Sequence, residues 1–96
     1  MDDINEANEN QRLIEALLVS VHDRQVSGQL TTLRDLHGLL GVSQPKALRL
    51  ASQVERDGHI VIEGDPMDRF ASIVSLNPSK PKWFLGEARR WNPFAK

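Results

Sequence analysis

Residues 43–78 read SQPKALRLASQVERDGHIVIEGDPMDRFASIVSLNP, and this stretch decides the fold of the chain. Its first third has apolar residues at the i, i+3, i+4 and i+7 spacing of a helix, namely Ala47, Leu50, Ala51 and Val54. After Gly58 come two β-rich runs, separated by the turn-forming sequence GDPMDR. The pattern predicts a helix over residues 43–57, followed directly by a β-hairpin over residues 59–76.

The residues at both ends of this predicted helix indicate where it begins and ends. Ser43 is a suitable N-cap, and Pro45 falls in the first turn, where a missing N–H costs no hydrogen bond. Asp57 and Gly58 then close the helix. The second strand of the hairpin stops before Pro78, which cannot donate to a sheet. Helix and hairpin are therefore consecutive elements with almost no chain between them.

Another helix is predicted from about Asn10 to Arg24. Its apolar residues recur at helical spacing and are Leu13, Ile14, Leu17, Leu18 and Val21. Gly28 marks the break that follows the helix. Residues 1–9 are polar and acidic, and we expect them to form a flexible N-terminal segment.

A short helix is expected between these two, over residues 33–40. Thr32 is its N-cap candidate, and Asp35 follows three positions later, as in a capping box with a shorter acid. Gly41 ends the helix because glycine tolerates a left-handed backbone. Only residues 41–43 connect it to the next helix, and so short a turn makes two helices cross steeply.

Residues 10–78 are therefore expected to fold as one mainly α-helical domain with a small β-hairpin. Three helices with a short turn between the second and third, then a hairpin, are typical of a winged helix-turn-helix. In that fold the three helices form the core and the hairpin is a two-stranded wing. The steep crossing lifts helix 43–57 clear of the body.

The composition and the polar residues exclude several classes of protein. The 96 residues contain no cysteine, so disulfides and thiolate metal sites are ruled out. No apolar run is long enough for a signal peptide or a membrane span, and we expect a cytoplasmic protein without membrane association. The three histidines, His22, His37 and His59, lack metal-ligand spacing, and no catalytic motif stands out. The chain is predicted to be no enzyme and to need no cofactor.

Charge is distributed unevenly along the chain. The formal net charge is −1, yet residues 1–23 contain six carboxylates and only one arginine, Arg12. The remainder is therefore basic. An acidic first part and a basic remainder fit a protein that turns one side toward a polyanion. A solvated acidic helix with ordinary charges elsewhere also explains the pattern.

Three parts of the chain together resemble the MarR-type winged-helix transcription regulators. They are TLRDL at 32–36 with LGVS at 40–43, RL at 49–50 with VE at 54–55 and Gly58, and DPMDR at 65–69 with VSL at 74–76. The match covers about residues 30–78 without a gap. It implies that helix 43–57 recognises DNA, that residues 59–76 form the wing, and that the protein is a homodimer. The long flanking helices that join two subunits in this family are reduced here to one helix on each side.

If the apolar side of helix 43–57 is buried, its other side presents groups suited to DNA. Those polar residues are Gln44, Lys46, Arg49, Ser52, Gln53 and Arg56. Glutamine can pair with an adenine edge, and arginine or lysine with guanine. Arg49, one turn into the helix, is the leading base-reading candidate, while Gln53 and Arg56 are expected to contact phosphate. An ordinary solvated helix face carries the same residue types.

Further DNA contacts are expected outside this helix. Thr32 and Ser43 lie at helix starts, where backbone N–H groups and hydroxyls receive phosphate, although capping alone also explains Thr32. Arg69 in the wing can reach phosphate or the minor groove. The flanking Asp65 and Asp68 provide another explanation, because an aspartate–arginine pair would brace the turn.

The C-terminal segment 79–96 is both basic and aromatic. A short helix is expected over about residues 81–91, and the sequence leaves open whether this tail is helical or disordered. Trp83, Phe84 and Trp91 are costly to expose, so we expect them to form a dimer or partner contact. Stacking of these rings on single-stranded nucleic acid is the other interpretation.

Two functional hypotheses result. The first is a sequence-specific regulator of transcription that binds double-stranded DNA as a homodimer. The second is a winged-helix module that binds a protein and has no DNA specificity of its own. Two features favour the second hypothesis. The net charge of the chain is near neutral, and Leu48 lies where MarR-type regulators commonly have a small polar residue that faces DNA.

Overall fold

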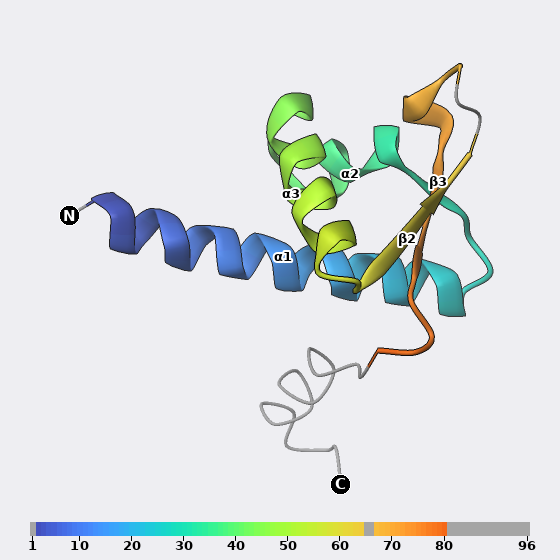
Figure 1. Ribbon diagram of the computed structural model, residues 1–96, viewed down its shortest axis with the longest axis horizontal. Coiled ribbons are helices and arrows are strands. Elements are labelled where there is room, and N and C mark those ends of the chain that lie inside the picture. The colour runs from blue at the N-terminus through green and yellow to red at the C-terminus, as the bar shows by residue number, and fades with distance from the viewer. Residues whose placement is uncertain (1, 65–66, 81–96) are drawn as a thin grey trace, which may run out of the picture.

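The computed structural model describes residues 2–64 and 67–80, with residues 2–7 described through their backbone alone (Figure 1). The elements are α1 (Asp2–Val26), β1 (Thr31–Thr32), α2 (Leu33–Leu40), α3 (Gln44–Arg56), β2 (Ile60–Glu63), the 3₁₀ turn η1 (Arg69–Ala71) and β3 (Ile73–Leu76). This part of the chain is mainly helical, with a small antiparallel sheet. In Figure 1, α2, α3 and the hairpin all lie on one side of α1.

The helix α1 is longer than predicted, because it begins at Asp2 and not near Asn10. The segment 1–9, which was expected to be separate from the helix, is helical from Asp2 onward. It contains no proline or glycine that would interrupt a helix. As a result, the first half of α1 extends past α3 (Figure 1).

The helices α2 and α3 begin and end where the sequence predicts. Thr32 and Asp35 form the expected capping box of α2, and Gly41 ends that helix in the left-handed conformation with φ of 68°. The Ser43 hydroxyl accepts a hydrogen bond from the Lys46 N–H at 3.4 Å, which caps α3. The same short turn, 41–43, therefore ends one helix and starts the next.

The sheet has three strands in the order β1–β3–β2, all antiparallel, where a two-stranded hairpin was predicted. The strand β1 is only two residues long, too short for an alternating pattern to be visible in the sequence. It pairs Thr31 with Val74 and Thr32 with Ile73. The second strand of the hairpin is shorter than the predicted run over residues 70–76, since Phe70 and Ala71 belong to η1 and β3 begins at Ile73.

The core unites every major element. The residues buried at its centre are Ile14, Leu17, Leu18, Val21, Leu33, Leu36, Ala47, Leu50, Ala51, Val54, Ile60, Val74 and Leu76. All five apolar residues predicted for the first helix contribute, although Leu13 is only partly buried, and so do the four predicted for α3. Because the inner side of α3 is held in this core, its opposite side faces solvent.

Candidate nucleic-acid interface

The outer face of α3 carries the residues predicted to read DNA. Arg49, Gln53 and Arg56 are exposed and lie on the side opposite the buried residues. Ser43, at the start of the helix, is exposed as well. Gln44 is half-buried beside it. We call the three exposed residues Arg49, Gln53 and Arg56 the α3 stripe.

The α3 stripe lies between two surface hollows. One runs along the outer side of α3 and is lined by Leu48, Arg49, Ser52, Gln53, Arg56 and Asp57. The other lies between α1 and α3 and is lined by Asn10, Lys46, Arg49, Leu50 and Gln53. Arg49 and Gln53 line both hollows, so they form the ridge between them. Within the described ranges, neither Arg49 nor Arg56 forms an ion pair.

Lys46 differs from the other predicted contacts because it already has an anionic partner. Its ammonium nitrogen Nζ lies 3.5 Å from Oε1 of Glu9, in the first half of α1. The Lys46 side chain is 31% exposed and that of Glu9 is 62% exposed. Sequence reasoning missed this pair because the two residues are 37 positions apart and Glu9 was expected to lie in a flexible segment.

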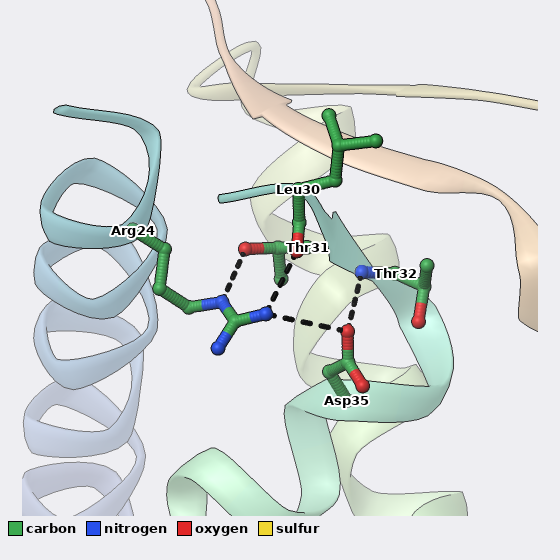
Figure 2. Close-up of polar contacts among 5 residues, drawn as sticks. All are labelled: Arg24, Leu30, Thr31, Thr32 and Asp35. Atoms are coloured by element: carbon green, nitrogen blue, oxygen red, sulfur yellow. Dashed lines mark hydrogen bonds and ion pairs between the residues drawn. The ribbon is translucent and has the colours of Figure 1, made fainter. Parts of the chain in front are cut away.

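The start of α2 is fixed by a network of polar contacts around Arg24 and Asp35 (Figure 2). The Thr32 backbone N–H donates to Asp35 Oδ2 at 3.0 Å. The Arg24 guanidinium donates from Nε to the Thr31 hydroxyl at 2.9 Å and from Nη2 to the Leu30 carbonyl at 2.7 Å. The same Nη2 lies 3.7 Å from Asp35 Oδ2. These contacts give Thr32 a capping role and tie α1 to both β1 and α2.

The electrostatics of this network act on Asp35. The hydrogen bond from the Thr32 N–H is the main cause that lowers the pKa of the Asp35 carboxyl below its ordinary value. Burial opposes this effect, while the Thr32 hydroxyl and the positive charges of Arg24 and Arg34 add to it. The carboxylate therefore stays ionised and keeps the α2 N-terminus occupied.

The hairpin turn approaches the first turn of α2. Asp68 Oδ2 lies 3.8 Å from Nη2 of Arg34, which sequence reasoning did not single out. Among the described residues, the ion pair of Asp68 is thus with Arg34 and not with the predicted neighbour Arg69. Arg69 itself is exposed in η1. Asp65, the other residue expected to brace Arg69, lies outside the described residues.

The described chain ends beside the C-terminal end of α3. Asn77 Nδ2 donates to the Gly58 carbonyl at 2.9 Å, and the Asn77 N–H donates to the His59 carbonyl at 3.0 Å. Lys80 then places its side chain over Gly58. The predicted partner contacts, Trp83, Phe84 and Trp91, and the predicted short helix over 81–91 lie outside the described residues.

No group of three or more histidine, aspartate or glutamate residues in the described ranges is arranged to hold a metal ion. None of the helices in those ranges is long and apolar enough to cross a membrane. Neither the known protein-family models nor the curated proteins contain a match to this chain.

Proposed function

We propose that this chain is a winged helix-turn-helix regulator of transcription, of the MarR type, that binds a specific sequence in double-stranded DNA. The observation that carries the proposal is the α3 stripe, an exposed polar row on a helix whose opposite side is fully buried. A helix of 13 residues is about 20 Å long. A helix about 10–12 Å across matches the width of the major groove of B-DNA.

Each residue of the site has a distinct role in this proposal. Arg49 faces the base edges and pairs with guanine through two hydrogen bonds. Gln53 and Arg56 contact the phosphates further along the groove, where a positive charge attracts DNA of any sequence. Ser43 and Gln44 lie at the start of the helix, the end that usually enters the groove most deeply.

The hairpin supplies the second set of contacts. Arg69 is exposed in the turn that follows β2, and it reaches the neighbouring phosphates or the minor groove. Arg34 forms an ion pair with the Asp68 carboxylate and so supports that turn. Thr32 holds the start of α2, because its N–H donates to the Asp35 carboxylate and is not open to a phosphate.

We further propose that the protein acts in the cytoplasm as a homodimer on paired half-sites. Dimers of such regulators place two recognition helices one DNA turn apart, or a multiple of it, so operator symmetry follows protein symmetry. Trp83, Phe84 and Trp91, outside the described residues, are the proposed contact between subunits.

Fluorescence anisotropy with a labelled duplex tests the site. We expect the affinity to fall steeply as salt rises, because phosphate contacts release counterions. The protein should bind its preferred sequence more tightly than random duplex. Arg49→Ala should reduce this difference in binding free energy by about 1–3 kcal/mol, the usual value of a bidentate base contact. Arg56→Ala is the matched comparison, because it removes the same charge from the same face of α3 but should weaken binding to all sequences about equally. Undetectable binding at low salt would refute the proposal.

A second candidate function is a protein-binding module. Leu48 favours it, because this apolar side chain lines the hollow on the outer side of α3, where a DNA-reading helix usually has a polar residue. Size-exclusion chromatography with light scattering, with and without duplex, separates the two. A strict monomer that does not bind duplex supports the module, whereas a dimer that shifts on duplex supports the regulator.

A further inference from the structure

Glu9 of α1 and Lys46 of α3 form an ion pair between the two helices. Lys46 lies in the first turn of α3, the end that enters the groove in the proposed function, on which this inference rests. Glu9 comes from α1 and brings its carboxylate to 3.5 Å from the Lys46 ammonium. This carboxylate occupies the position that a DNA phosphate would take beside the same ammonium. A phosphate that approaches Lys46 therefore competes with Glu9 for the same positive charge.

The geometry around this pair places Glu9 at the edge of the α3 stripe. Asn10, the next residue along α1, lines a hollow together with Lys46, Arg49 and Gln53. The helix α1 continues from Glu9 back to Asp2, and this part extends past α3 (Figure 1). A duplex lying along α3 must therefore pass close to α1 at this point.

We infer that Glu9 is an internal competitor for phosphate, which lowers the affinity of the recognition helix for DNA backbone of any sequence. A phosphate contact at Lys46 carries no sequence information, because it depends on charge alone. Weakening that contact leaves the base contacts of Arg49 unchanged. Glu9 therefore lowers the affinity for every duplex by about the same factor, and it sets the strength of DNA binding without changing the preference among sequences.

The inference predicts a gain of affinity on a single substitution. Glu9→Gln keeps the shape of the side chain but removes its charge, so it frees Lys46. Two unit charges about 4 Å apart in water attract by about 1 kcal/mol, which corresponds to about fivefold in affinity. We expect Glu9→Gln to bind random-sequence duplex about fivefold more tightly than the wild type. The slope of the logarithm of affinity against the logarithm of salt concentration should become steeper by about 0.9, the value for one additional phosphate contact.

Two further variants separate this competition from a general effect of charge. Asp23→Asn removes the same charge from an exposed site near the other end of α1, and it should leave affinity nearly unchanged. Lys46→Gln removes the residue for which Glu9 competes. In a Lys46→Gln background, Glu9→Gln should therefore give almost no gain.

The test is an anisotropy titration with random-sequence duplex. It compares the wild type, the three single variants and the double variant. A gain for Glu9→Gln that disappears in the Lys46→Gln background supports the inference. If the wild type binds duplex but Glu9→Gln has the same affinity as Asp23→Asn, the inference is wrong and the proposed function still stands. A gain that persists without Lys46 overturns it too, because general repulsion then explains the effect. If none of the proteins binds duplex at low salt, the proposed function fails and this inference fails with it.

Discussion

At the scale of single residues, Asp35 shows how polar contacts fix an element that supports the proposed site. Its carboxylate accepts the Thr32 N–H at 3.0 Å and lies 3.7 Å from the Arg24 guanidinium (Figure 2). The guanidinium also reaches Leu30 and Thr31 in the preceding loop and strand. Asp35 is therefore where the end of α1, the strand β1 and the start of α2 meet.

We expect Asp35→Asn to lower the free energy of unfolding at neutral pH by about 1 kcal/mol, because a charge-assisted hydrogen bond becomes a neutral one and the negative charge beside Arg24 is lost. Because the pKa of Asp35 is lowered in the folded chain, the stabilising contribution is present above the ordinary value of 3.8. It is lost as the pH falls through the lower value in the folded protein. Urea unfolding followed by circular dichroism, from neutral to acidic pH, should show that the deficit of the variant shrinks in acid.

Asp23→Asn is the matched control for this experiment, because Asp23 is 71% exposed and its described ion pair is only with the adjacent His22. Its effect on stability should stay within a few tenths of a kcal/mol. A deficit for Asp35→Asn that is the same at every pH would contradict the assigned role of the carboxylate.

At the scale of elements, the hairpin depends on a close approach between its two strands. A Cβ atom added to Gly64 would lie 2.5 Å from the Ser72 Cα, and backbone cannot yield as a flexible side chain can. Ser72 is itself fixed, since its N–H donates to the Arg69 carbonyl and its carbonyl accepts the Leu33 N–H. The hairpin that carries Arg69 is thus joined to α2 through this serine.

Gly64→Ala should destabilise the protein by about 1–3 kcal/mol, the usual cost of overpacking. Gly38→Ala provides the matched control, because Gly38 lies inside α2 and an added Cβ there meets nothing within 4 Å. Alanine at that exposed helical position should stabilise the protein by about 0.5–1 kcal/mol. Chemical unfolding of both variants measures their free energies of unfolding relative to the wild type. A Gly64→Ala protein as stable as the wild type would contradict the close approach of Gly64 to Ser72.

The elements also show what the sequence can and cannot predict. The bounds of α2 and the buried residues of α3 follow from caps, glycines and apolar spacing, all of which act within a few positions. The strand β1 is a product of pairing with β3, and its two threonines look like a helix cap in sequence. The early start of α1 was missed because a polar segment carries no apolar period.

The candidate site shows the same division. The outward direction of Arg49, Gln53 and Arg56 follows from the burial of their neighbours, so the sequence is enough to predict it. The partners of Lys46 and Asp68 depend on how α1, α2 and the hairpin are brought together. Long-range ion pairs of this kind leave no pattern in a single sequence.

At the scale of the whole molecule, the acidic residues of the first part of the chain and the arginines proposed to bind DNA belong to different elements. All six acidic residues of 1–23 belong to α1, while Arg49 and Arg56 lie on the outer face of α3 and Arg69 lies in the hairpin. The core holds α3 by its apolar side and leaves the polar side open. The central claim is that this open side of α3, with the hairpin beside it, binds duplex DNA in a sequence-dependent way.

Selection of bound sequences from a random duplex library tests that claim most directly, because it measures binding and specificity together. We predict that the wild-type protein enriches one motif and that Arg49→Ala, selected in parallel, loses the preference at one position of it. A folded wild-type protein that enriches no sequence over the starting library would contradict the claim.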